Sequence, residues 1–168
     1  IDVIEGGFDV VVRIGRLAES GLVARRLARD RLVVCAAPSY LEAHGEPQRP
    51  EELISHNCLH YSLVDRDAEW RFRKAPAFPT SGNCTTSNGT VLREAAVAGL
   101  GIVILPSLMV VREVNEGSLR LILEGSRRAE IGVYAVTAHR SHAPARTRAF
   151  LDFLTTYFAN PGWATLGI

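Results

Sequence analysis

The segment from residue 83 to residue 106 constrains the fold most, because it reads as a strand, a helix and a second strand. Residues 83–87 have the composition of a short strand. Ser87 or Asn88 can then cap a helix, since both side chains accept hydrogen bonds from the free N–H groups of a first helical turn. The apolar face of this helix is expected at Val91, Leu92, Ala95 and Ala96.

The end of this helix and the second strand are equally well marked. Gly99 is suited to the left-handed conformation that commonly ends a helix. Residues 101–105 form an apolar run that Pro106 closes, which predicts a buried strand. Two strands joined through a helix by such short connections must lie parallel. The chain is therefore predicted to have an α/β fold.

The rest of the chain alternates between apolar runs and helical patterns. Residues 8–14 predict a buried parallel strand that ends at Gly15. Two strands at 22–28 and 31–37 are expected to form a hairpin that turns at Arg29-Asp30. Further strands are expected at 57–63, 69–74, 119–123 and 129–138, and helices at 38–44, 107–116 and from Pro144 onward.

Composition and charge argue against several classes of protein. A chain of 168 residues suffices for one compact domain or two small lobes, and its net charge of +1 carries no nucleic-acid signature. It contains no apolar run of membrane length, so we expect no membrane partner. Three cysteines without a C-x-x-C pair favour a reducing compartment, so we expect a cytoplasmic protein. No nucleotide-binding, hydrolase or metalloprotease motif is present, so we expect neither a cofactor nor an enzyme.

Four arginines near the expected hairpin form a basic cluster. Such a cluster can mark a nucleic-acid surface or a solvated sheet edge that discourages strand addition. We favour the sheet edge, because acidic residues balance the total charge and no aromatic platform accompanies the arginines. The cluster consists of Arg25, Arg26, Arg29 and Arg31.

The best candidate for a ligand site lies where parallel strands end and helices begin. Backbone N–H groups of Gly89 and Thr90, together with the side chains of Ser87 and Asn88, can hold a carboxylate or another polar group. The helix dipole would add ~0.3–1 kcal/mol. The alternative is that Ser87 and Asn88 only cap the helix, which we expect for at least one of them.

Other strand ends supply the remaining candidates. Leu105 and Pro106 can form an apolar wall, and Tyr61 and Ser62 can add hydroxyl groups. Tyr61 is alternatively a half-buried core residue. The loop after the first strand adds Arg13 and Gly15, where Arg13 can instead pair with Asp9 and Gly15 can serve only the turn.

The pattern His56-x-Cys58-x-His60 invites a metal or thiol interpretation. On one strand the three side chains would share a face, and all can bind zinc. A fourth ligand is not evident, however, so we expect no metal. Residues two apart on a strand also lie ~7 Å apart, which is too far for a hydrogen-bonded catalytic pair. A small enzyme that uses Cys58 or Cys84 is therefore the weakest alternative.

The order of several phrases resembles the effector-binding domain of LysR-type transcriptional regulators. The resemblance covers roughly residues 1–160, and no single phrase is diagnostic without the others. The phrases are GFDVVVRIG at 7–15, GLVARRLARDRLVVCAAPSYLEAHGEP at 21–47, PEELISHNCLHY at 50–61, EWRF at 69–72, NGTVLREAAVAGLGIVILPSLMV at 88–110 and VYAV at 133–136.

The resemblance implies two α/β lobes, as in type 2 periplasmic binding proteins, with a small molecule bound between them. Residues 1–36 and 131–160 would form the first lobe, residues 37–130 the second, and residues 161–168 a tail. The family has a further β-α-β unit before residue 1, so we expect an N-terminally truncated chain with an incomplete first lobe. Its exposed strand edges should make the fragment self-associate.

The resemblance also implies a function and partners. The domain would sense a small-molecule effector, form homodimers, and belong to a tetramer in the intact regulator. DNA would be bound only through an N-terminal winged helix-turn-helix that this chain lacks. A solute-binding protein of the same fold remains an alternative, and a signal peptide upstream would favour it.

Overall fold

The structure, a computed structural model, describes residues 7–15, 23–62, 69–70, 72, 78–124, 130–137 and 144–159. Within this part of the chain, residues 7–30 and 130–159 form unit 1, and residues 31–124 form unit 2. The predicted assignment to two lobes stays a prediction, and the predicted tail lies outside the described residues.

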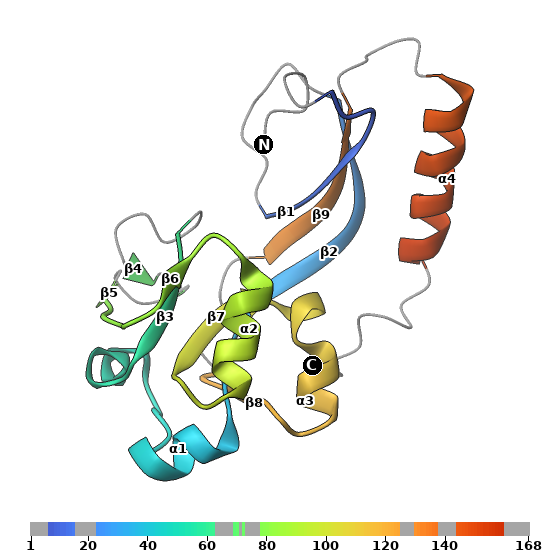
Figure 1. Cartoon of the computed structure of the whole chain (residues 1–168). Helices are drawn as coiled ribbons and strands as arrows, with labels where there is room; N and C mark the ends of the chain where they lie inside the picture. The colour runs from blue at the N-terminus through green and yellow to red at the C-terminus, as the bar shows by residue number, and fades with distance from the viewer. Residues whose placement is uncertain are drawn as a thin grey trace. The chain divides into compact units, whose positions relative to one another are not determined.

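Unit 1 is a small antiparallel arrangement with one helix (Figure 1). In strand order β9 is flanked by β1 and β2, and Val11 of β1 lies opposite Val136 of β9. An ion pair of 3.3 Å joins Arg25 of β2 to Asp152 of α4. The elements of unit 1 are β1 (Val11–Gly15), the first part of β2 (Val23–Ala36), β9 (Glu130–Thr137) and α4 (Ala145–Ala159).

The prediction of a buried parallel strand at 8–14 was wrong in both respects. β1 pairs antiparallel with β9 and stands at the end of the strand order. Phe8, Val12 and Ile14 are exposed by 40–51%. A continuous apolar run is typical of a strand that is buried on both faces, but it does not identify the elements that pack on those faces.

Unit 2 is built on parallel and antiparallel strands together. β3 pairs parallel with β6 and β7, whereas β2 pairs antiparallel with β7 and β8. β4 and β5 form a separate antiparallel pair. The elements of unit 2 are the end of β2, α1 (Pro38–His44), η1 (Pro50–Ser55), β3 (Cys58–Tyr61), β4 (Glu69–Trp70), β5 (Phe78–Pro79), β6 (Thr85–Thr86), α2 (Gly89–Val97), β7 (Ile102–Pro106), η2 (Ser107–Met109), α3 (Val111–Asn115) and β8 (Arg120–Ile122).

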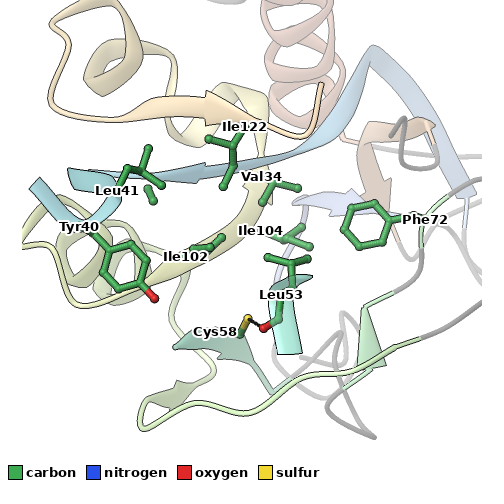
Figure 2. Packing of buried hydrophobic residues seen from close by; sticks show 10 residues of the cluster. Val34, Tyr40, Leu41, Leu53, Cys58, Phe72, Ile102, Ile104 and Ile122 are labelled. Carbon is green, nitrogen blue, oxygen red and sulfur yellow. Dashed lines mark hydrogen bonds between the residues drawn. The ribbon is translucent and has the colours of Figure 1, made fainter. Parts of the chain in front are cut away.

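Two hydrophobic clusters in unit 2 contain alternate residues of the same strands. Because successive side chains of a strand point to opposite faces, Ile102 and Ile104 of β7 join one cluster while Val103 and Leu105 join the other. Figure 2 shows the first cluster, which Tyr40 and Leu41 of α1 and Leu53 of η1 complete. The second cluster includes Leu92 and Ala96 of α2 and, further along the chain, Val110 and Leu119.

Most elements of unit 2 confirm the sequence predictions. The helix at 38–44 begins with Pro38 in its first turn, and α2 and β7 agree with the predicted helix and second strand to within a residue or two. Gly99 follows α2 with a φ of +77°, the left-handed conformation predicted for it. The expected helix at 107–116 is divided into a short 3-10 turn, η2, and the helix α3.

The predicted hairpin at Arg29-Asp30 does not exist. β2 is one strand of 14 residues, and the change from unit 1 to unit 2 falls between Asp30 and Arg31. Arg-Asp lacks the glycine or asparagine that tight hairpin turns favour, and Asp30 is buried. The arginine cluster therefore lies along a continuous strand and not at a hairpin. Its residues precede the registers in which β2 pairs with β7 and β8, which begin at Leu32 and Val34, so its interpretation as a sheet edge stays a prediction.

Candidate ligand-binding site

The carboxyl ends of β3, β6 and β7 meet at one edge of the sheet in unit 2. In the parallel register, Tyr61 of β3 pairs with Thr86 of β6, and Leu59 of β3 pairs with Val103 of β7. This arrangement brings together the predicted site residues of unit 2: Tyr61, Ser62, Ser87, Asn88, Gly89, Leu105 and Pro106.

Asn88 is the residue that caps α2. Its side-chain oxygen accepts hydrogen bonds from the N–H groups of Thr90 at 2.9 Å and Val91 at 3.4 Å. The Asn88 N–H in turn donates to the hydroxyl of Thr86 at 3.2 Å. Ser87 is exposed and does not cap the helix. Of the two amides predicted to hold a ligand, that of Thr90 is already occupied, and that of Gly89 is the first-turn donor that Asn88 does not use.

Replacing Asn88 with alanine is expected to destabilise the protein by about 1 kcal/mol, because two N–H groups of the first turn lose their acceptor. Asn88→Asp keeps an acceptor and should restore most of the loss. Urea unfolding followed by circular dichroism measures both variants, and Ser87→Ala is the matched control. An equal loss in Ser87→Ala would show that the two residues share the capping role.

Gly89 allows α2 to start close against β7 and η2. A Cβ atom at Gly89 would lie 2.7 Å from Cε of Met109 and 3.6 Å from Cδ2 of Leu105. The side chains of Met109 and Leu105 therefore pack directly beside the helix start, which makes this side of the site apolar. Met109 was not among the predicted site residues, although its position shortly after the strand-ending Pro106 could have indicated it.

Arg93, which pairs with the buried Glu113, holds the backbone near Met109. Arg93 of α2 donates to the carbonyl of Met109 at 3.4 Å and pairs with Glu113 of α3 at 3.3 Å. Glu113 is only 4% exposed and also pairs with Arg112 at 3.2 Å. The Arg93–Glu113 pair therefore joins α2 to the segment after β7. Sequence reasoning missed this pair because its partners lie 20 residues apart.

Tyr61 and Ser62 stand where β3 ends. Tyr61 is half-buried and packs against the second hydrophobic cluster. The Ser62 N–H donates to the Thr86 carbonyl at 3.0 Å, which continues the β3–β6 pairing past the strand itself. The Ser62 side chain is exposed. Together with the Gly89 amide these residues place hydrogen-bonding groups beside apolar walls, as small-molecule sites require.

Arg13 and Gly15 belong to unit 1, and their predicted ligand contacts stay predictions. Asp9 pairs with Arg146 of α4 at 3.6 Å, a partner that the sequence did not indicate. Gly15 is the last residue of β1 and has a φ of +139°, which suits a glycine at a turn.

Most cysteine and histidine residues of unit 2 belong to its packed interior, whereas Cys84 is partly buried and His44 is exposed. Cys58 is fully buried, with its thiol donating to the Leu53 carbonyl at 3.5 Å (Figure 2). Burial raises the pKa of Cys35 to about 12. His56 precedes β3 and is not part of that strand. Within the described residues, no three histidine, cysteine or carboxylate side chains gather closely enough to hold a metal ion.

The described helices include none that is both long enough and apolar enough to cross a membrane.

Comparison with known proteins gives a consistent result. Residues 1–159 match the family described as "LysR substrate binding domain". The "HTH-type transcriptional activator AaeR" of Escherichia coli K12 is 35% identical over 165 residues, which are 96% of this chain and 53% of that protein. The "HTH-type transcriptional regulator CrgA" of Neisseria meningitidis serogroup B is 36% identical over 163 residues, 95% of this chain and 54% of that protein.

Solved structures agree with the sequence comparison. The CrgA regulatory domain from Neisseria meningitidis superposes with a TM-score of 0.83 at 34% identity, covering 92% of this chain and 78% of that one. The effector domain of AmpR from Pseudomonas aeruginosa shares the fold, with a TM-score of 0.75 at 21% identity, covering 95% of this chain and 75% of that one. This chain spans about half the length of the curated relatives that it matches.

Proposed function

The chain belongs to the family of LysR substrate-binding domains, and we propose that it senses a small molecule and thereby controls the DNA binding of a transcriptional regulator. The observation that carries this proposal is the edge of unit 2 where β3, β6 and β7 end beside the start of α2. The Gly89 amide and the hydroxyls of Tyr61 and Ser62 would orient the polar part of the effector. The exposed hydroxyl of Ser87, two residues before Gly89, would add a further hydrogen bond. Leu105, Pro106 and Met109 would hold its apolar part.

Control would operate through a shift between two conformations. An effector changes the output only by the difference in its affinity for the two states, typically 1–3 kcal/mol in regulatory proteins. DNA contact would come from another part of the intact regulator. We also propose that the domain acts in the cytoplasm and is not an enzyme. The transcriptional regulators among its relatives support these proposals over a solute-binding role.

Ligand binding can be tested by thermal unfolding with a panel of small carboxylates that range from acetate to benzoate. A bound compound should raise the melting temperature and saturate with concentration. Loss of one hydrogen bond in Ser62→Ala or Ser87→Ala should weaken its affinity up to about tenfold. Ser55→Ala, an exposed serine of η1, is the control. An affinity unchanged by Ser62→Ala, Ser87→Ala and Gly89→Ala would rule out this site.

The regulatory part of the proposal needs the intact protein. A stabilising carboxylate should change its affinity for operator DNA at constant salt concentration. Binding of that compound without any change in operator affinity would contradict effector control, even if the site itself were correct.

Self-association is expected from the exposed apolar surface of unit 1, and it would agree with the homo-oligomers proposed for the intact regulator. The exposed fractions of Phe150, Phe153 and Tyr157 on α4 are 46%, 60% and 52%, and their rings stack in sequence. Val12 and Ile14 are exposed on β1, at one end of the strand order. Exposed apolar helix faces and edge strands of this kind favour association.

Size-exclusion chromatography with light scattering measures this association. The mass should rise with concentration, and Phe153→Ser together with Ile14→Lys should reduce the rise. A single monomeric mass up to millimolar concentration would contradict the prediction.

A further inference from the structure

Tyr40, His56 and Asn57 form a buried polar junction where the chain enters β3. Tyr40 of α1 is 3% exposed and His56 is 8% exposed. The Tyr40 hydroxyl lies 3.2 Å from Nδ1 of His56 and accepts a hydrogen bond from the Asn57 N–H at 2.9 Å. The neighbouring residues His56 and Asn57 thus both contact the hydroxyl of Tyr40, which lies 16 residues before His56.

This geometry fits a neutral His56. The Tyr40 oxygen already accepts the Asn57 N–H, so the hydroxyl proton is directed to Nδ1 of His56. That nitrogen can accept only when the imidazole carries its single proton on Nε2. A protonated histidine has donors on both nitrogens, so the Tyr40 hydroxyl would then face a second donor and lose its acceptor inside a buried site.

Asn57 connects this junction to the framework of unit 2. Its side-chain amide donates to Oδ1 of Asn83 at 2.9 Å and to the Leu100 carbonyl at 2.6 Å. Its own carbonyl accepts the Ile102 N–H at 2.9 Å. These bonds lie at the amino ends of β3 and β7, strands whose carboxyl ends carry the candidate ligand site.

We infer that the Tyr40–His56 contact is a proton-sensitive latch: when His56 gains a proton, α1 separates from the start of β3. The latch is a pH response of unit 2 that is separate from effector binding, and it does not depend on the proposed function. It would couple the order of the β3–β7 region to the acidity of the compartment.

The groups around His56 determine the direction of the response. Burial lowers the pKa of His56 below its ordinary value of 6.5, the nearby His44 of α1 lowers it further, and Glu52 of η1 raises it. His44 also stacks on the Tyr40 ring, with centroids 4.3 Å apart. Burial raises the pKa of Tyr40, the hydrogen bond from the Asn57 N–H lowers it, and the charge of Cys58 on β3 raises it. The net pKa lies above the ordinary value, so the Tyr40 hydroxyl stays protonated.

Proton linkage determines whether stability rises or falls with pH. The folded state binds a proton at His56 less readily than the unfolded state, because its pKa is lowered. The stability that the junction contributes is therefore present above pH 6.5 and is lost as the pH falls through the folded-state pKa. One proton corresponds to a change of about tenfold in the opening equilibrium for each pH unit within that window.

The wild-type chain provides the first test. The Hε1 chemical shift of His56, followed by NMR from pH 8 to pH 5, should titrate below 6.5. Exchange protection of the Asn57 amide, corrected for intrinsic exchange, should fall by up to about tenfold per pH unit in the same range. Titration of His56 at or above 6.5, or constant protection of Asn57, would overturn the latch.

Two variants complete the test. His56→Gln offers an acceptor that cannot be protonated, so Asn57 protection should no longer depend on pH. His44→Gln is the matched control, and there the loss of protection should persist and begin at a higher pH. A pH response that survives in His56→Gln would overturn the assignment. If that variant fails to fold, the wild-type titration still decides the question.

Discussion

Replacing Gly101 with alanine is expected to destabilise the protein by roughly 2–4 kcal/mol, because the new methyl group has no space. A Cβ atom at this position would lie 2.2 Å from the carbonyl oxygen of Asn57 and 3.1 Å from its carbonyl carbon. That carbonyl cannot move freely, since it accepts the Ile102 N–H and begins the parallel pairing of β3 with β7. Relief of the clash therefore requires a shift of one strand against the other.

A second glycine variant distinguishes the cost of a steric clash from the cost of backbone strain. Gly117 has a φ of +79° but open space where a Cβ atom would lie, so Gly117→Ala should cost only about 1 kcal/mol. Urea unfolding of both variants, monitored by circular dichroism, gives the comparison. A loss below about 0.5 kcal/mol in Gly101→Ala would mean that β3 and β7 shift apart easily, and would contradict their close packing at Asn57.

The region around Gly101 was also the part of the fold that sequence analysis predicted best. Its signals are local: Asn88 or Ser87 as a cap, Gly99 as a left-handed helix end, and Pro106 as a strand end. Each acts within a few residues, so the sequence alone contains the physical cause. The parallel orientation of β6 and β7 followed from the short joints, and the structure confirms it. The two strands do not pair directly, because β3 lies between β6 and β7 and pairs parallel with both.

Predictions failed where the cause lies in distant contacts. Arg29-Asp30 resembled a turn because charged residues interrupt an apolar run, yet β2 continues through it from unit 1 to unit 2. The apolar run of β1 predicted burial, but burial depends on which partner covers the strand. The pattern of apolar residues indicates which side chains of a segment favour burial. It does not tell which other segment of the chain covers them.

In the candidate site, too, local features could be predicted and features that depend on distant contacts could not. Strand ends and the helix start could be predicted, so Asn88 was named from the sequence as a possible cap of α2 and Ser62 as a residue at the end of β3. Their ligand contacts stay predictions. Met109 and the Arg93–Glu113 pair could not, because tertiary packing alone brings them to α2. His56 was noticed for its spacing from Cys58, whereas its described partner is Tyr40, on a helix earlier in the chain.

Replacing Leu92 with alanine is expected to have the largest effect within α2, a destabilisation of about 2–5 kcal/mol. Leu92 is fully buried in the second cluster, where it packs with residues of β3 and β7, so truncation leaves a cavity between helix and sheet. Val91 was predicted to share that apolar face, but it is 48% exposed.

Val91→Ala is therefore the matched control, one residue away on the same helix. Its cost should stay within about 0.5 kcal/mol, since alanine favours helix formation and little burial is lost. The two variants differ in which face of α2 they change, and the midpoint of urea unfolding measures the difference. Equal losses would mean that α2 does not use Leu92 to hold its first turn against β7, and the candidate site would then lack the rigid support that we assign to it.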